Sequence, residues 1–346
     1  MEKIKILIWG FGAMGRGMAE MLLTKTGIEI VGICDINPFL AGKGIHEVLD
    51  YQGDHPDVFI HANIDDLLAE TKADLALLCT DSFTKGAFPK IKKMVENGIN
   101  CISTAEEMSY PYVNEPTLAK EMDALAKKHG VSILGTGINP GFIMDLLVVA
   151  LTGVMTHVDS IEAKRINSLS PFGPVVMHEQ GVGITLEEYN KRLADKDLAG
   201  HVGFKESIYM IANALGLELD YFQQQMEPII TNIDRKSPYG EAKKGNLAGI
   251  DMRGQGFKDD KVLINMIHPQ QIEPEMVGIN TGDYINLTGN PNISMAITPE
   301  INGGSGTIAM CVNMIPHVIN AKPGLKTMID LPVPRAIMGD MRNFID

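Results

Sequence analysis

A glycine-rich segment near the start of the chain has the spacing of a dinucleotide-binding loop. It reads Gly10-Phe11-Gly12-Ala13-Met14-Gly15 and follows an apolar run that ends at Trp9. The first glycine permits a tight turn, the second lets the backbone approach a diphosphate, and the third allows a helix to pack closely on the preceding strand. The diphosphate would then be held by the first amides of the helix and by the helix dipole. The segment therefore predicts a site for NAD or NADP.

A carboxylate at the end of the second predicted strand supports this interpretation. Asp35 closes the apolar run 29–35, at the distance from the glycine loop that dinucleotide-binding units require. A carboxylate there accepts hydrogen bonds from the ribose hydroxyls of NAD and repels the 2′-phosphate of NADP. NAD is therefore predicted, and NADP stays an alternative because Arg16 could reach a 2′-phosphate. A glycine-rich turn that binds nothing is disfavoured in this context.

Polar residues also follow three further predicted strands, at the edge where a parallel sheet binds its ligands. The cofactor-binding candidates among them are Thr80, Ser82 and Thr104, and the substrate-binding candidates are Asp81, Glu106 and Asn139. Thr80 to Ser82 could instead cap the following helix, and Glu106 and Glu107 could be first-turn helix residues that face solvent. The segment 135–141 contains three glycines, which imply close approach of its backbone to another group.

The second half of the chain offers a cation and a base. Arg165 continues the apolar face that Ile161 and Ala163 begin, so it either pairs with a buried acid or binds substrate. His201 titrates near neutrality and, with Glu206 at a helix start, is a candidate catalytic acid or base. A histidine in a surface loop is the alternative for His201.

Other chemistries find no support in the sequence. No His, Cys or Asp cluster has the spacing of a metal site, so no metal is predicted. No nucleophile elbow and no phosphate-binding loop of the kinase type is present. The net charge of −13 disfavours nucleic acid and anionic membranes as partners. No apolar run is long enough for a membrane span or a signal peptide. The four cysteines show no Cys-x-x-Cys spacing, which is typical of reduced thiols. Together these features predict a cytoplasmic location.

Short apolar runs alternate with amphipathic segments over the first 140 residues. The predicted strands are 4–9, 29–35, 75–79, 99–103 and 131–134. Because these runs lack alternation, they are typical of strands that helices cover on both faces. The fold class is therefore α/β, with a Rossmann-type doubly wound parallel sheet in a dinucleotide-binding domain, residues 1–140.

A second domain, residues 141–304, is predicted to be α+β with a mixed or antiparallel sheet. Helices are expected at 142–155, after the Thr185 cap, and at 204–215, with an antiparallel pattern over 227–297. A helix from about Ser305 should kink or end at Pro316. The prolines of the tail disfavour regular structure there, and residues 305–346 are expected to pack back on the first domain.

The sequence resembles the 2,4-diaminopentanoate dehydrogenases, which are relatives of dihydrodipicolinate reductase. The resemblance covers nearly the whole chain. It is carried by five segments: 9–15, Ser103-Thr104-Ala105-Glu106-Glu107, Gly137-Ile138-Asn139-Pro140-Gly141-Phe142-Ile143-Met144-Asp145, 200–207, and the tail from Asn313 to Pro332. The Lys-x-Asp-x-Pro-Ser-Gly-Thr segment of the reductases is missing, which disfavours the reductase reaction.

The resemblance implies oxidative deamination of 2,4-diaminopentanoate with NAD(P)+, as in ornithine fermentation, to 2-amino-4-oxopentanoate and ammonia. His201 and Glu206 are then candidates for the base, and Asp81, Glu106, Asn139 and Arg165 for binding the diamino acid. The alternatives are 3,5-diaminohexanoate, diaminopimelate or a cyclic imine as substrate, and a regulatory protein that senses NAD(H). We expect a homo-oligomer, a dimer, with oligomerisation through the second domain.

Overall fold

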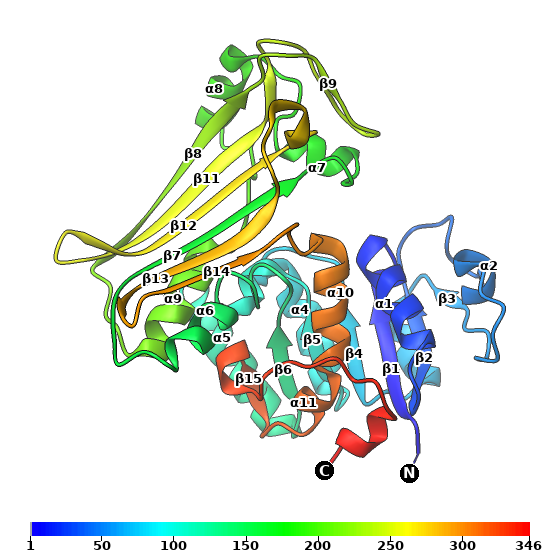
Figure 1. Ribbon diagram of the computed structural model, residues 1–346. Coiled ribbons are helices and arrows are strands. Elements are labelled where there is room, and N and C mark those ends of the chain that lie inside the picture. Colours follow the sequence, from blue (N-terminus) through cyan, green and yellow to red (C-terminus); the bar gives the residue numbers. More distant parts are fainter. Residues whose placement is uncertain (1) are drawn as a thin grey trace. The chain divides into compact units, whose positions relative to one another are not determined.

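The chain forms two compact units, of which the second is inserted into the first. The computed structural model describes residues 2–346. The first unit comprises Met1–Phe142 and Gly303–Asp346, and the second comprises Ile143–Asn302. Figure 1 shows that the chain leaves the first unit after β6 and returns to it at α10.

The first unit contains a seven-stranded parallel sheet in the order β15-β6-β5-β4-β1-β2-β3. Its strands are β1 (Ile4–Trp9), β2 (Ile28–Cys34), β3 (Ile60–His61), β4 (Leu75–Leu78), β5 (Asn100–Ser103), β6 (Ser132–Gly135) and β15 (Gly324–Lys326). The predicted Rossmann-type sheet is confirmed, although β3 and β15 are too short to be visible as apolar runs. β1 lies near the middle and places the glycine loop at the carboxyl edge.

Helices cover both faces of this sheet, as its apolar strands require. They are α1 (Ala13–Leu23), α2 (Ile45–Leu49), α3 (Ile64–Glu70), α4 (Thr84–Glu96), α5 (Pro116–His129), α10 (Gly303–Asn313) and α11 (Ile315–Ile319). Leu7 and Trp9 of β1 pack in a buried cluster with α3, α4 and α5, while Ile8 points to the face of α1.

Local signals explain where several helices begin and end. The Asn63 side chain accepts a hydrogen bond from the Asp65 amide at 2.8 Å, which caps α3. Pro116 opens α5, and Gly130 ends it in the left-handed conformation with φ +72°. The helix from 303 ends at Asn313, and Pro316 lies in the first turn of α11, so the predicted break is confirmed.

The second unit is built on a six-stranded sheet in the order β14-β13-β7-β12-β11-β8. Its elements are α6 (Leu146–Thr152), β7 (His157–Ser168), α7 (Pro174–Glu179), α8 (Leu186–Ala194), α9 (Phe204–Leu215), β8 (Tyr221–Ile230), β9 (Arg235–Lys236), β10 (Glu241–Ala242), β11 (Leu247–Lys258), β12 (Lys261–Gln271), β13 (Gly282–Asn290) and β14 (Ile293–Ile297). β11 pairs antiparallel with β8 and β12, and β13 pairs antiparallel with β14 and β7, but β7 pairs parallel with β12. The sheet is therefore mixed.

Two sequence expectations are wrong in detail. The predicted helix 142–155 shortens to Leu146–Thr152, because the Asp145 side chain accepts the Leu146 amide at 2.6 Å and caps the helix there. The tail is not wholly irregular, since β15 adds to the sheet edge beside β6.

Candidate functional site

The glycine loop of the first unit has the geometry that its sequence predicts. Gly10 has φ +94°, and a Cβ there would lie 2.7 Å from the Cys79 carbonyl oxygen. A Cβ on Gly15 would lie 1.9 Å from the Gly10 carbonyl oxygen, so α1 can pack on the loop only without a side chain. A Cβ on Gly12, in contrast, would meet nothing within 4 Å. The first and third glycines are needed for packing, and the second faces open space.

The start of α1 can receive an anion. The helix begins at Ala13 without a side-chain cap and without an acidic residue in its first turn. Gly12 and Ala13 are exposed, whereas Phe11 is buried in the core and Met14 is half-buried. Uncapped amides and the positive end of the helix dipole favour a phosphate group at this position.

Asp35 is fixed beside this loop by two backbone amides. Its Oδ2 accepts the Phe11 amide at 2.5 Å and its Oδ1 accepts the Asn37 amide at 2.8 Å. The carboxylate keeps lone pairs for ribose hydroxyls in this orientation. Arg16 donates from Nε to the Phe11 carbonyl oxygen at 3.1 Å, which holds its guanidinium on the same loop.

The residues after β4 and β5 are tied to one another. The Thr80 hydroxyl donates to Asp81, whose Oδ2 also lies 2.6 Å from Lys90 Nζ. The Thr104 hydroxyl donates to the Leu78 carbonyl oxygen at 3.4 Å. The alternative that Thr80 to Ser82 cap α4 is wrong. The first residue of that helix, Thr84, donates its amide to Glu107 Oε2 at 2.8 Å, so the cap comes from the other strand end.

The two remaining candidates from this edge, Glu106 and Asn139, differ in their hydrogen bonding. Glu106 opens a short 3-10 helix and is half-buried, and the carbonyl oxygen of Ser82 accepts the amide of Glu107 at 3.2 Å. Asn139 has both side-chain amide atoms buried without a hydrogen-bond partner, and the Thr136 hydroxyl is in the same condition. A buried amide without partners costs free energy that a bound ligand can restore. Asn139 therefore stays a candidate ligand-binding residue of the 135–141 segment.

Arg165 in the second unit pairs with a buried acid, which was one of its two predicted alternatives. Its Nη1 lies 2.6 Å from Asp283 Oδ1, and both side chains are almost fully buried. Nη2 donates to the Ile301 carbonyl oxygen. Burial raises the pKa of Asp283, and the Arg165 charge acts in the opposite direction. The pair fixes β7 against β13 at the polar end of the sheet.

His201 lies in a loop, but it is not the solvated surface histidine of the alternative. Its Nε2 is buried without a partner, and its ring packs edge-on against His268 with centroids 4.9 Å apart. Burial lowers the pKa of His201 to about 3, and the charge of Arg165 contributes. His201 is therefore a neutral imidazole with a free ring nitrogen.

Glu206 begins the buried face of α9. It is 2% exposed, and its neighbour Ser207 donates its hydroxyl to Asp145 Oδ2 at 2.8 Å. Phe204 at the start of the same helix contacts the His201 ring edge-on, with centroids 5.3 Å apart. The two predicted catalytic residues thus flank Phe204 within one unit.

Four polar residues join His201 on this unit, and the sequence analysis missed two of them, His268 and Gln270. His268 and Gln270 continue the buried face that Ile264 and Met266 begin on β12, and Gln270 pairs with Asn167 of β7 in the sheet register. Asn167 Oδ1, Gln180 Oε1 and Gln270 Nε2 are buried without partners. Gln180 also donates to the Gly200 carbonyl oxygen at 2.9 Å, next to His201. The change from apolar to polar residues along the buried face of β12 was the sequence signal that could have identified His268 and Gln270.

Comparison with known proteins identifies the family. Residues 142–346 match the 2,4-diaminopentanoate dehydrogenase C-terminal domain. The whole chain is 60% identical to a 2,4-diaminopentanoate dehydrogenase from Acetoanaerobium sticklandii, with 100% of this chain and 98% of the relative covered. The chain belongs to the 2,4-diaminopentanoate dehydrogenase family. The resemblance noted in the sequence is thereby confirmed.

Solved structures extend the comparison from the family to its fold. An amine dehydrogenase from Mycobacterium smegmatis has a TM-score of 0.86 and 25% identity, with coverage of 97% of this chain and 98% of that one. A structure of GenD2 from gentamicin A biosynthesis in complex with NAD has a TM-score of 0.57 and 13% identity, with 95% and 90% covered. The second similarity supports the two-unit fold alone.

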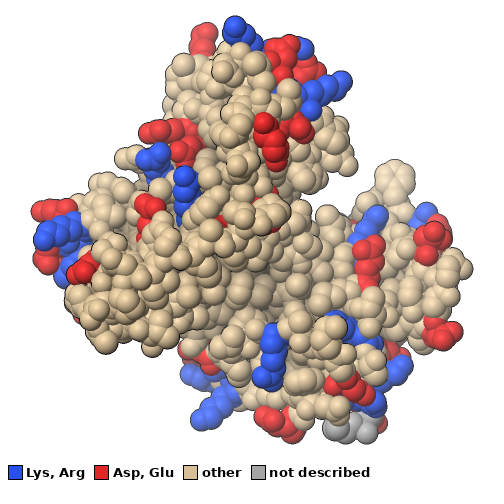
Figure 2. Space-filling view, in the orientation of Figure 1, with Lys and Arg blue, Asp and Glu red and all other residues tan. Residues whose placement is uncertain are grey.

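Neither a metal site nor a membrane-spanning helix is found in the described part of this family member. Within residues 2–346, no three His, Cys, Asp or Glu side chains are grouped so that they could hold a metal ion. No helix within the same residues is long and apolar enough to cross a membrane. On the face drawn in Figure 2, Lys and Arg side chains are interspersed with Asp and Glu.

Proposed function

We propose that this protein oxidatively deaminates 2,4-diaminopentanoate to 2-amino-4-oxopentanoate and ammonia with NAD(P)+. The observation that carries the proposal is the open glycine loop with Asp35 held on the Phe11 amide, in a chain of this family. As part of the same proposal, the enzyme acts as a homodimer in the cytoplasm and serves ornithine degradation.

The first unit supplies the residues that would hold the dinucleotide. The loop Gly10 to Gly15 fits a diphosphate, because Gly12 faces open space and α1 begins without a cap. Asp35 fits the adenosine ribose, and Thr80, Ser82 and Thr104 lie at neighbouring strand ends. When bound, NAD(P)+ accepts the hydride from the amine-bearing carbon of the substrate.

The second unit supplies both hydrogen-bond acceptors and hydrogen-bond donors that have no partner in the protein. Carbonyl oxygens of Asn167 and Gln180 can accept hydrogen bonds from ammonium groups, and the Gln270 amide nitrogen can donate to a carboxylate. A diamino acid carries both groups. We therefore add these residues to the proposed substrate-binding candidates Asp81, Glu106, Asn139 and Arg165. Arg165 is ion-paired with Asp283 and Asp81 with Lys90, so we assign Arg165 and Asp81 as positioning residues in this scheme.

The amine must lose a proton before its carbon can release hydride, so a base is required. His201 is neutral and its Nε2 is free to accept a hydrogen bond from the reacting amine. Glu206 is the second candidate, and its carboxylate is buried on the same unit. In this proposal His201 orients the amine and Glu206 receives the proton, since an imidazole with so low a pKa is a weak base.

A substrate panel tests the proposal. Purified protein is mixed with NAD+ or NADP+ and with 2,4-diaminopentanoate, 3,5-diaminohexanoate or diaminopimelate, and absorbance of the reduced cofactor is followed. Dihydrodipicolinate with NADH tests the reductase alternative. We expect 2,4-diaminopentanoate to give the highest kcat/KM. A higher value with another substrate would reassign the activity, and NADH binding without any turnover would favour a regulatory protein. Size-exclusion chromatography with light scattering tests the dimer.

A further inference from the structure

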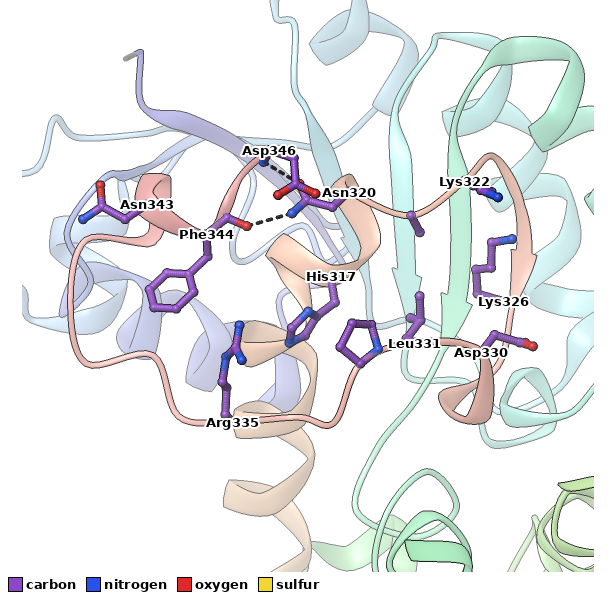
Figure 3. A pocket seen from close by; sticks show the side chains of 12 residues that line it. His317, Asn320, Lys322, Lys326, Asp330, Leu331, Arg335, Asn343, Phe344 and Asp346 are labelled. Atoms are coloured by element: carbon purple, nitrogen blue, oxygen red, sulfur yellow. Dashed lines mark hydrogen bonds between the residues drawn. The ribbon is translucent and has the colours of Figure 1, made fainter. Parts of the chain in front are cut away.

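The C-terminal segment of the first unit lines a half-open cavity that the proposed reaction does not use. The cavity has a volume of about 600 Å³ and is lined only by residues from His317 onward. Its walls come from α11, β15 and the tail that follows β15 (Figure 3). Asn320 donates from Nδ2 to the Phe344 carbonyl oxygen at 2.8 Å and accepts the Asp346 amide at 3.2 Å, which fastens the tail over the cavity. Volumes of this size are typical of small-molecule sites.

Three cations line this cavity without a partner of opposite charge. They are Lys322, Lys326 and Arg335. Within residues 2–346, none of them forms an ion pair. Other lysines of the first unit, such as Lys85, Lys90 and Lys127, are paired with acidic side chains. Arg335 instead lies over the Phe344 ring, 5.3 Å from its centroid, which holds the guanidinium in place.

A buried imidazole adds a second, independent sign of a ligand. His317 is 7% exposed, and its Nε2 has no hydrogen-bond partner. Burial lowers the pKa of His317, and the nearby charge of Arg335 contributes. Figure 3 shows His317 and Arg335 together at one end of the cavity, with Lys322 and Lys326 at the other. The positive groups are therefore distributed between two ends.

Two carboxylates also line the cavity, but one of them is engaged. Asp330 Oδ2 accepts the Thr327 amide at 2.8 Å and the Thr327 hydroxyl at 2.7 Å, as the cap of a 3-10 helix. Asp346 lies beside Asn320 at the rim. Leu331, Pro332 and Phe344 give the cavity an apolar wall. The lining thus suits a molecule with a carbon body and acidic groups at both ends, rather than a lone inorganic ion.

We propose that this cavity binds a small organic anion with two separate acidic groups, a polycarboxylate or a phosphorylated carboxylic acid. One acidic group would lie between Arg335 and the free nitrogen of His317, and the other between Lys322 and Lys326. Arg and Lys side chains are the groups that bind carboxylate and phosphate oxygens most strongly.

Titration of the intact protein with two probes tests the proposal. Citrate and 3-phosphoglycerate, which has a phosphate at one end and a carboxylate at the other, are added at constant ionic strength to protein saturated with NAD+, so that the glycine loop is filled. Binding is measured by calorimetry. We expect saturable binding of at least one probe and no binding of glycerol. Binding of citrate alone would identify the site as specific for carboxylates, and binding of 3-phosphoglycerate alone would show that it requires a phosphate.

A pair of matched variants decides whether the binding occurs in this cavity. Lys322→Gln with Lys326→Gln should raise Kd about tenfold, whereas Lys120→Gln with Lys128→Gln on the exposed face of α5 removes the same charge and should leave Kd unchanged. His317→Gln should also weaken binding. Equal losses in both double variants, or no binding of either probe to the wild type, would overturn the proposal. Turnover of 2,4-diaminopentanoate without anion should be equal in all of these variants.

Discussion

Replacing Asp35 by alanine tests the cofactor site most directly. The two backbone hydrogen bonds of Asp35, at 2.5 and 2.8 Å, fix its carboxylate beside the glycine loop. Two ribose hydroxyls of NAD would each donate one hydrogen bond to this charge. One such bond contributes about 1.5 kcal/mol, so loss of both costs about 3 kcal/mol, or roughly 100-fold in kcat/KM for NAD+.

The same substitution removes the negative charge that would repel the 2′-phosphate of NADP. The kcat/KM for NADP+ is therefore expected to stay constant or rise, and the ratio of NAD+ to NADP+ should fall about 100-fold or more. Steady-state kinetics with both cofactors and 2,4-diaminopentanoate measure this ratio.

The control is Asp74→Ala, because Asp74 Oδ2 also accepts a backbone amide, that of Lys5, at 2.7 Å. Asp74 immediately precedes β4, at the amino ends of the strands, far from the carboxyl edge in the sheet. The control should lose stability without a change in cofactor ratio. A ratio in Asp35→Ala that stayed within about threefold of the wild type would refute the assignment of Asp35 to the ribose.

Three further predictions concern the glycine loop, the buried ion pair and His201. Gly15→Ala should lower the melting temperature, since its Cβ would lie 1.9 Å from a carbonyl oxygen, while Gly12→Ala should melt normally but bind NAD+ more weakly; normal binding would contradict the diphosphate placement. Arg165→Met leaves Asp283 buried without its partner and should cost about 3–5 kcal/mol of unfolding free energy near pH 8. Because burial raises the pKa of Asp283, this loss should shrink as the pH falls through that raised pKa and the carboxyl becomes neutral, which urea titrations at several pH values can check. His201→Ala should lower kcat more than NAD+ affinity. With a pKa of about 3, His201 should give no inflection in kcat near neutral pH, and one that vanished in the variant would contradict its burial.

The fold was predictable where one local signal dominates. The strand 4–9 and the helix 204–215 have the predicted bounds, because an uninterrupted apolar run and a regular apolar stripe each suit one structure only. β3 and β15 were missed since two or three residues carry no periodicity, and they form only by adding to edges of an existing sheet. The parallel pairing of β7 with β12 depends on contacts between strands about a hundred residues apart.

The candidate site was predictable only in part, for a related reason. Gly10 to Gly15 and Asp35 act through local backbone geometry, which sequence spacing specifies. The burial of His201 depends on the side of β12 that carries His268, and the partner of Arg165 is Asp283 on another strand. Such pairings become visible only when the sheet register is known.

The insertion of one unit within the other constrains the order of biosynthesis. β15 pairs with β6, and α10 packs on α1, yet residues 143–302 separate these elements in the chain. While the inserted unit is translated, the edge of β6 therefore lacks its neighbouring strand, and α1 lacks the helix that packs on it. The inserted unit can complete its own sheet first, so a chaperone that shields nascent chains should engage residues 1–142 for longer than it engages 143–302.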